Sequence, residues 1–266
     1  MCLIVLRFDP DAEHPLLVVA NRDEFHHRAT AALAWWPDAP ILGGRDLQAG
    51  GTWLAVDGSG RFGALTNLRG TVPPKDAPSR GELIPRFLKS GLSPESFLQE
   101  LRQEAHRFAG FNLLLGSASG IWLYCNAEPG TIRELPPGTH ALSNGRFGTP
   151  WPKVEGASRA LDDHLDGKQD WASLRCVLSD RNVAPDDRLP DTGLPLELER
   201  RLSAAFIVSQ GYGTRSTTVC ALQGPGGWLE ETTYNPDGSD ASTVRDRKST
   251  RLNSSHIPLS RMPSSA

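Results

Sequence analysis

Apolar and alternating runs along the chain predict short strands arranged largely in hairpins. A polar Asp-Pro-Asp turn separates the first two runs, and Asp57-Gly58-Ser59-Gly60 supplies glycines for a tight turn between the next two. A Gly-Pro-Gly-Gly segment at 224–227 separates the last pair. The predicted strands cover residues 3–8, 16–20, 52–56, 61–67, 111–116, 121–126, 214–223 and 228–234.

Helical periodicity appears in the middle of the chain. Ser79-Arg80-Gly81-Glu82 has the pattern of a capping box ahead of an apolar helical stripe, and Ser93-Pro94 is a typical helix start. Helices are also predicted at about 153–166 and 171–178. Hairpins at both ends of the chain with helices between them predict an α+β protein in which antiparallel sheets are covered by helices.

Glycine-rich phosphate motifs are missing from the places where a nucleotide-binding fold needs them. No GxGxxG or GxxxxGK[ST] follows a predicted strand, so a nucleotide-binding fold is disfavoured. Gly43-Gly44 and Gly50-Gly51 are interpreted as turns. Residues 1–239 are predicted to form one domain.

The last segment, residues 240–266, is polar and lacks periodicity, which predicts a disordered tail. Asp246–His256 can also be written in codons that match a common sequencing adapter. We therefore interpret this segment as a translated artefact that lies outside the fold.

Composition narrows the class of protein. The 266 residues carry 28 basic and 31 acidic side chains without a basic stripe, which argues against a nucleic-acid partner. No apolar run approaches the roughly 20 residues that span a bilayer, and the first strand lacks the features of a signal peptide. Together with the few cysteines, these features predict a soluble, cytoplasmic protein whose oligomeric state is not specified.

Metal and cofactor signals are weak. The four cysteines contain no CxxC pair, and His26-His27 lacks a third ligand at suitable spacing, so neither a metal site nor a cofactor is predicted. Cys125, Cys176 and Cys220 lie in apolar surroundings and are interpreted as small core residues.

Cys2 is the main candidate for chemistry. Removal of Met1, which is usual before a small residue, would place a thiol and a free α-amine on Cys2. An α-amine titrates near pH 7.7–8.0, so it can accept the thiol proton without a histidine partner. The alternative is an inert cysteine at the start of a strand.

A polar tetrapeptide at the end of the second strand favours the catalytic reading. Asn21-Arg22-Asp23-Glu24 sits where adjacent side chains point to opposite faces of a sheet, although polar residues also end ordinary strands. With the Met-Cys start it resembles the NRDE-motif family, also called the transport and Golgi organization 2 family. The matching pieces are MCLIVLRFDP, LVVANRDEF, GGTWLAV, GALTN, RGEL, GFNLLLG, LSNGRFGTPW and GYGTR.

This family in turn is similar to the N-terminal-nucleophile hydrolases, which implies a four-layer αββα sandwich with Cys2 as nucleophile. The resemblance to bile-salt hydrolases and penicillin V acylases implies that Asp23 holds the α-amine while Arg22 lowers the thiol pKa. A structural ion pair between Arg22 and Asp23 is the alternative.

The same resemblance implies further site residues. Asn67 and Asn144 are candidates for stabilising the oxyanion, and Arg215 matches a late active-site arginine. Each has a structural alternative, a turn-capping asparagine or a solvated cation. The candidate substrate-binding residues are Asn21, Glu24 and Trp53.

The predicted activity is hydrolysis or transfer of an acyl group from a small non-peptide amide or thioester. The alternative is a non-catalytic carrier of a hydrophobic ligand (lipid, acyl-CoA or haem), because function does not follow from fold. The apolar segments AWWP and TWLAV suit a pocket of either kind.

Overall fold

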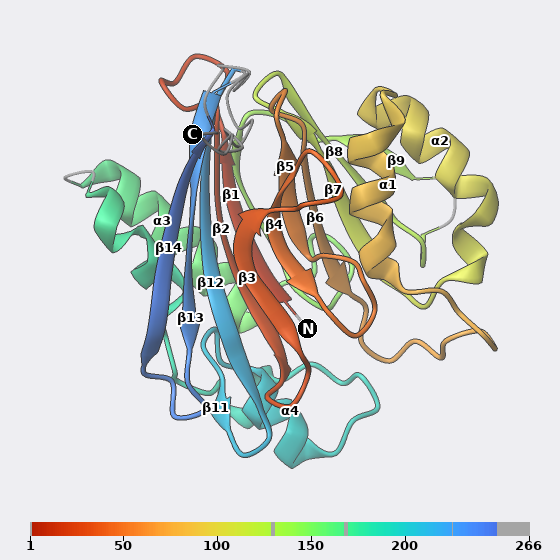
Figure 1. Ribbon diagram of the computed structural model, residues 1–266. Coiled ribbons are helices and arrows are strands. Elements are labelled where there is room, and N and C mark those ends of the chain that lie inside the picture. Colours follow the sequence, from red (N-terminus) through yellow and green to blue (C-terminus); the bar gives the residue numbers. More distant parts are fainter. Residues whose placement is uncertain (1, 129–130, 168–169, 225, 249–266) are drawn as a thin grey trace, which may run out of the picture.

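Two antiparallel sheets stack face to face, with helices on both outer faces (Figure 1). The computed structural model describes residues 2–128, 131–167, 170–224 and 226–248. The predicted four-layer αββα sandwich is confirmed in this part of the chain.

Within the described residues, each sheet has seven strands. In the first sheet the order is β10-β1-β2-β12-β13-β14, with β11 paired to β12, and in the second it is β3 to β9 in sequence order. The strands are β1 (Cys2–Phe8), β2 (Leu16–Phe25), β3 (Thr30–Trp35), β4 (Ile41–Asp46), β5 (Leu54–Asp57), β6 (Phe62–Asn67), β7 (Phe111–Ser117), β8 (Gly120–Cys125), β9 (Ile132–Glu134), β10 (Gly138–Leu142), β11 (Val208–Ser209), β12 (Tyr212–Gln223), β13 (Gly226–Tyr234) and β14 (Asp240–Lys248).

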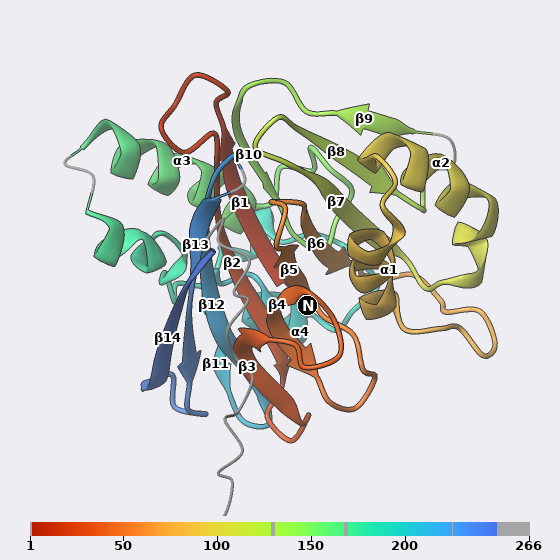
Figure 2. The ribbon, with the colours of Figure 1, turned by 45° about the horizontal axis from the view of Figure 1, so that its top comes forward.

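The helices divide between the two outer faces. Figure 2 shows α1 and α2 outside the second sheet and α3 outside the first. The α-helices are α1 (Leu83–Ser90), α2 (Pro94–Glu104), α3 (Pro152–Asp166) and α4 (Leu196–Leu202). Short 3₁₀ helices are η1 (Arg80–Glu82), η2 (Ala105–Arg107), η3 (Trp171–Leu178) and η4 (Asp186–Arg188).

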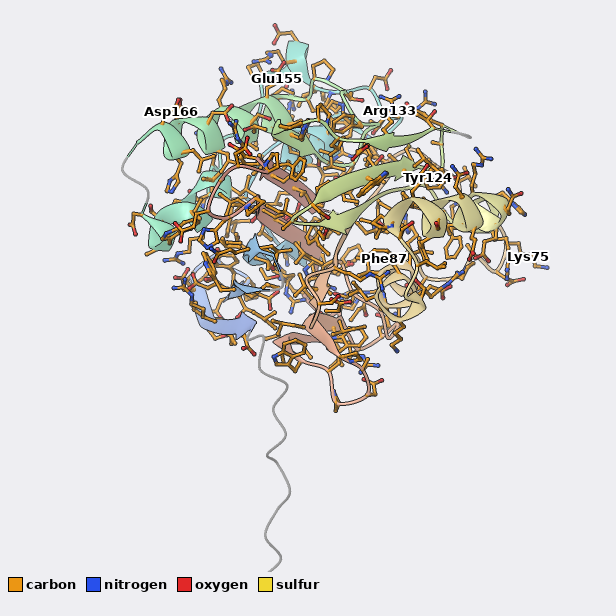
Figure 3. The ribbon with its side chains drawn as sticks, turned by 90° about the horizontal axis from the view of Figure 1, so that it is seen from above. Lys75, Phe87, Tyr124, Arg133, Glu155 and Asp166 are labelled. Atoms are coloured by element: carbon orange, nitrogen blue, oxygen red, sulfur yellow. The ribbon has the colours of Figure 1, made fainter. Side chains whose placement is uncertain are left out.

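Strand alternation creates three buried apolar layers. On β1, Ile4 and Leu6 pack between the sheets, while Leu3 and Val5 pack against α3 and η3. The third layer lies under α1 and α2 and includes Phe87 and Tyr124, which Figure 3 places on the opposite side of the molecule from Asp166 of α3. Because the central strands are covered on both faces, β1, most of β2 and β7 are nearly continuous apolar runs.

Two local predictions were wrong. Gly43 and Gly44 lie inside β4 rather than in a turn. They are glycines because neighbouring groups leave no room for a side chain at either position. A Cβ at Gly44 would lie 2.4 Å from the Trp53 ring, and one at Gly43 would lie 2.7 Å from the Leu54 carbonyl oxygen. The Ser79 side chain makes no capping hydrogen bond. Residues 171–178 form a helix as predicted, and it is of the 3₁₀ type.

The predicted domain boundary at residue 239 also needs correction. Residues 240–248 are not disordered but form β14, which pairs along β13 from Tyr234 to Gly227. An edge strand needs backbone partners on one side only, so a polar segment can form it without an apolar face. The rest of the predicted tail, residues 249–266, lies outside the described residues, as does Met1.

None of the helices in the described ranges is long and apolar enough to cross a bilayer.

Candidate active site

Cys2 begins β1 and borders a cavity of about 400 Å³. Antiparallel pairing sets Cys2 directly opposite Arg22 of β2, and β12 flanks β2 on its other side. Cys2 and Arg22 therefore point to the same face, toward the second sheet. The cavity lining combines these residues with others from β4 to β6 and from the segment 73–81, and it includes Glu24, Arg28, Asp46, Thr52, Trp53, Leu65, Asn67, Pro73, Pro78 and Arg80.

Cys2 is 8% exposed, and neighbouring groups shift the pKa of its thiol in opposite directions. Burial raises the pKa of the thiol, and the carboxylates of Asp23 and Glu24 raise it further. The Arg22 charge lowers this pKa. The thiol is consequently the resting form in this arrangement, and a base must take its proton before it can attack.

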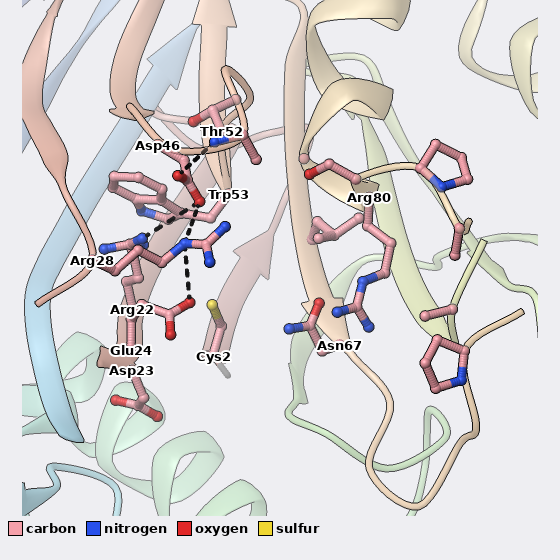
Figure 4. Close-up of a pocket in the computed structure, with 18 residues that line it drawn as sticks. Cys2, Arg22, Asp23, Glu24, Arg28, Asp46, Thr52, Trp53, Asn67 and Arg80 are labelled. Atoms are coloured by element: carbon pink, nitrogen blue, oxygen red, sulfur yellow. Dashed lines mark hydrogen bonds and ion pairs between the residues drawn. The ribbon is translucent and has the colours of Figure 1, made fainter. Parts of the chain in front are cut away.

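Arg22 is held in place by contacts on several sides. Its guanidinium carbon lies 4.3 Å from the Trp53 ring centroid, and its Nη1 donates a hydrogen bond of 3.0 Å to Thr30 Oγ1. Asp46 lies 3.9 Å from Arg22 Nη2. The guanidinium is thus a fixed positive charge on the same face as the thiol, as Figure 4 shows.

A second arginine, Arg28, forms ion pairs with carboxylates beside Arg22. Arg28 Nε donates to Asp46 at 2.7 Å and lies 3.7 Å from Glu24. Glu24 and Trp53, two of the predicted substrate-binding residues, line the cavity, and their contact with a substrate stays a prediction. Arg28 and Asp46 were not predicted, because neither belongs to a motif that carried chemistry in the sequence.

The opposite wall of the cavity carries Asn67 and Arg80. Asn67 ends β6, and its side-chain amide faces Cys2 across the cavity in Figure 4. Arg80 begins η1 and donates from Nη1 to the Gly110 carbonyl oxygen at 2.8 Å. Arg80 was not predicted either, although it lies in the RGEL motif, which was the available signal.

Asn21 does not lie in the cavity, so its prediction as a substrate-binding residue was wrong. It alternates with Arg22 along β2 and points to the opposite face of the sheet. Its Nδ2 donates to the carbonyl oxygens of Leu178 and Ala205, each at 2.9 Å, and its Oδ1 accepts from Thr217. This fully buried amide ties β2 to the helical layer.

Asp23 borders the cavity, but its carboxylate points away from Cys2 toward the helical layer (Figure 4). Its Oδ1 accepts a hydrogen bond of 2.7 Å from Thr214 Oγ1. Burial raises the pKa of Asp23, and the Lys153 charge lowers it. No ion pair joins Asp23 to Arg22 among the described residues, which argues against the simple structural pair.

More buried charges surround Asp23. Lys153 donates to the Leu202 carbonyl oxygen at 2.9 Å, and burial lowers its pKa to about 8 against the opposing charge of Asp23. Arg69 pairs with Glu199, and both side chains are 4% exposed. We call Asp23, Arg69, Lys153 and Glu199 the buried charge cluster.

Asn144 lies behind the cavity wall rather than in the lining. Its Nδ2 donates to the Asn67 carbonyl oxygen at 2.9 Å, while Ser143 Oγ donates to the Cys2 carbonyl oxygen at 3.0 Å. The structure therefore corrects the prediction that Asn144 faces the substrate directly. Its contacts instead hold Asn67.

Arg215 also lies outside the cavity that contains Cys2. Its Nη1 donates to the carbonyl oxygens of Phe25, His26 and Arg28, at 2.9, 3.1 and 3.3 Å. A break in the β2–β12 register at Arg215 redirects its side chain toward the loop after β2. Arg215 borders a neighbouring cavity that shares Arg22 and Trp53 with the first, so the prediction that it joins Cys2 was wrong.

The other three cysteines differ in exposure. Cys125 and Cys220 are buried as predicted, whereas Cys176 is exposed. Across the described residues, no group of three histidine, cysteine, aspartate or glutamate side chains is arranged to hold a metal ion.

The chain matches known proteins along nearly its whole length. The family model of Transport and Golgi organisation 2 matches residues 1–235. The Transport and Golgi organization protein 2 homolog of Homo sapiens is 33% identical over 249 residues, covering 85% of this chain and 90% of that protein. Transport and Golgi organization protein 2 of Drosophila melanogaster is 33% identical over 250 residues, covering 82% and 87%.

Among solved structures, the C2A mutant of conjugated bile acid hydrolase from Clostridium perfringens is similar with a TM-score of 0.51. The match covers 97% of this chain and 100% of that one at 10% identity, so it bears on the fold alone. The two chains therefore share a fold in which two stacked antiparallel sheets lie between helical layers. On the family match and the relatives together, the chain belongs to the Transport and Golgi organisation 2 family.

Proposed function

We propose that this chain is an N-terminal cysteine hydrolase or acyltransferase that acts on a small non-peptide amide or thioester. The observation that carries the proposal is the position of Cys2. Its thiol opens onto a cavity, a fixed arginine lies directly across the strand pair, and an asparagine amide faces it from the other wall. These are the parts that acyl transfer to a thiol requires.

In this mechanism Met1 is removed, and the α-amine of Cys2 accepts the Sγ proton. The sulfur attacks the acyl carbon, and the Asn67 amide stabilises the oxyanion of the tetrahedral intermediate. The ammonium then returns the proton to the leaving amine or thiol, and a Cys2 thioester remains. Water, or another acceptor, then attacks the thioester as it gives a proton to the α-amine. The C–S bond breaks, the acyl product leaves, and the ammonium returns the proton to Sγ, which restores the thiol.

Neighbouring groups would tune these steps. The Arg22 charge favours the thiolate once the proton has left, which offsets part of the cost of burial. The carboxylate of Asp23 lies on the far side of the strand end, where it would favour the protonated α-amine. Asn144 would act as a positioning residue through its hydrogen bond to Asn67.

A carrier of a hydrophobic ligand is the competing function, and the specific observation for it is the apolar part of the lining. Trp53, Leu65, Pro73 and Pro78 offer a surface for an acyl chain or ring system. A carrier would use this surface without any covalent step.

Trapping of an acyl-enzyme separates the two functions. Protein beginning at Cys2 is mixed with the thioester S-butyryl-N-acetylcysteamine, quenched in acid, and measured by intact mass and peptide mapping. The hydrolase proposal expects an added butyryl group on the Cys2 peptide, its absence in Cys2→Ala, and its retention in Cys176→Ala. Acylation of Cys176 alone, or of no cysteine, would contradict the proposal and favour the carrier.

A further inference from the structure

Two of the three arginines that line the cavity are already neutralised by carboxylates. Asp46 and Glu24 both lie within ion-pair distance of Arg28, and Asp46 also lies near Arg22. These four side chains form a closed group on the wall that carries Cys2. Their charges balance without any contribution from a ligand.

The third arginine, Arg80, is in a different situation. Its hydrogen bond is donated by Nη1 to a neutral acceptor, the Gly110 carbonyl oxygen. No carboxylate among the described residues lies within ion-pair distance of its guanidinium. The remaining edge of the guanidinium, Nε with Nη2, is the fork that matches a carboxylate with two parallel hydrogen bonds.

The backbone beside Arg80 is held against the segment that precedes β5. Thr52 N donates to the Gly81 carbonyl oxygen at 3.0 Å, and a Cβ at Gly51 would lie 2.3 Å from the Gly81 carbonyl carbon. Gly51 therefore permits a close approach that any side chain would prevent. This contact fixes the backbone at the start of η1, and the hydrogen bond to the Gly110 carbonyl oxygen holds the guanidinium itself. The guanidinium is thus preorganised for a ligand.

The position of Arg80 relative to Cys2 sets which part of a ligand it can meet. Figure 4 shows its guanidinium beside Asn67, on the wall opposite the Cys2 sulfur. Burial lowers the pKa of Arg80, whereas the Glu24 carboxylate, and Cys2 when it is a thiolate, raise it. Because a guanidinium stays protonated in proteins, a permanent positive charge stands at the far wall. A partly buried cation of this kind is stabilised when a bound molecule brings an anion.

We propose that Arg80 binds a carboxylate of the substrate, so that the substrates of this site are amides or thioesters that carry a carboxylate apart from the scissile bond. The inference rests on the proposed function for the identity of the scissile bond. The apolar lining by Leu65, Pro73 and Pro78 leaves space for a short chain between the two groups.

Binding to the Cys2→Ala protein tests this inference without turnover. Calorimetry compares three amides of similar length: N-hexanoylglycine, its neutral counterpart N-hexanoylethanolamine, and the adipic acid monoamide of ethanolamine. The first carries its carboxylate on the amine side and the third on the acyl side. We expect at least one acid to bind about ten- to a hundredfold more tightly than the neutral amide, as for a charge-assisted hydrogen-bond pair.

Variants assign that preference to Arg80. Arg80→Gln in the Cys2→Ala background should abolish the preference, Arg80→Lys should retain part of it, and Arg107→Gln should leave it unchanged because Arg107 is an exposed arginine on η2. Thermal unfolding of each variant is measured alongside. A preference that survives Arg80→Gln would overturn the inference, and so would equal loss of all three affinities or no binding of any amide.

Hydrolysis by the unmutated protein is measured separately with the same three amides. Carboxylate preference in binding with no hydrolysis and no acyl-enzyme would overturn the proposed function and support the Arg80 site. Hydrolysis of the neutral amide at the same kcat/KM as both acids would overturn the Arg80 site and support the proposed function.

Discussion

The polar side chains on the two faces of β2 have different surroundings at the end of the strand. Arg22 and Glu24 face the cavity, where one wall remains open to a ligand. Asn21 is closed off on the opposite face by buried hydrogen bonds, and the Asp23 carboxylate lies among the buried charge cluster. A single run of four polar residues thus supplies cavity-lining side chains on one face and buried, hydrogen-bonded side chains on the other.

Because of this difference, thiol reactivity and the free energy of unfolding can be tested separately at adjacent positions of β2. Substitutions on the buried face should change the free energy of unfolding, because unpaired polar groups there have no access to water. Substitutions on the cavity face should mainly change thiol chemistry.

The largest expected effect is on the Arg69–Glu199 pair of the buried charge cluster. Glu199→Gln should lower the free energy of unfolding by about 3–5 kcal/mol, because it leaves a buried guanidinium without its counter-charge. Urea denaturation measures this change. The control is Glu155→Gln, which removes an exposed pair with Arg188 and should cost no more than about 1 kcal/mol. Equal losses in the two variants would show that the cluster is no more important than a surface pair.

The next effect is a pH dependence due to Lys153. Its pKa is lowered to about 8 from 10.5, so between these values the unfolded chain takes up a proton that the folded chain does not. The free energy of unfolding should therefore rise with pH over this window by about 3 kcal/mol, since one pKa unit corresponds to about 1.4 kcal/mol.

Lys153→Met isolates that contribution, because all other titrating groups are shared. The difference in unfolding free energy between the two proteins should change in favour of the lysine protein from pH 8 to pH 10. Parallel pH curves would contradict the lowered pKa.

A moderate effect is expected for Asn21. Asn21→Ala leaves the carbonyl oxygens of Leu178 and Ala205 without their donor and should cost about 1–3 kcal/mol in urea denaturation. Glu24→Gln, at the partly exposed position on the other face, should change stability by less than about 1 kcal/mol. The reverse order would mean that the two faces have been assigned incorrectly.

The smallest effect in energy is on the cavity face. Arg22→Gln removes a favourable charge near Cys2 and should raise the thiol pKa, which lowers the thiolate fraction near pH 7. The rate of Cys2 alkylation by iodoacetamide, divided by the rate at exposed Cys176, reports this change. Arg107→Gln is the control for a lost arginine charge, and an unchanged ratio in Arg22→Gln would remove Arg22 from the account.

Sequence reasoning found much of the fold because hairpin signals and apolar runs are local. It also selected Cys2, Arg22, Asn67 and Trp53, which line the cavity and lie in strands or directly before one, within the quoted motifs. Strand alternation required Asn21 and Arg22 to diverge, but both faces of the sheet are buried. The pattern of burial therefore could not say which of the two reaches the cavity.

The missed residues depend on long-range contacts. Arg80 reaches the cavity because Gly51 and Thr52 hold the backbone at Gly81, a contact between segments about thirty residues apart. Arg215 was misplaced because an irregularity in strand pairing, invisible in the sequence, redirects it. β14 was missed because an edge strand can be polar.

Alkylation of Cys2 in protein whose first residue is Cys2 tests the central claim most directly. Intact mass establishes the N-terminus, and peptide mapping after brief exposure to iodoacetamide at neutral pH gives the rate at each cysteine. If Cys2 is an activated nucleophile, it should react faster than exposed Cys176 and far faster than buried Cys125 and Cys220, although it is only 8% exposed. A Cys2 that reacts as slowly as Cys125 and Cys220 would contradict an activated nucleophile and leave only the fold.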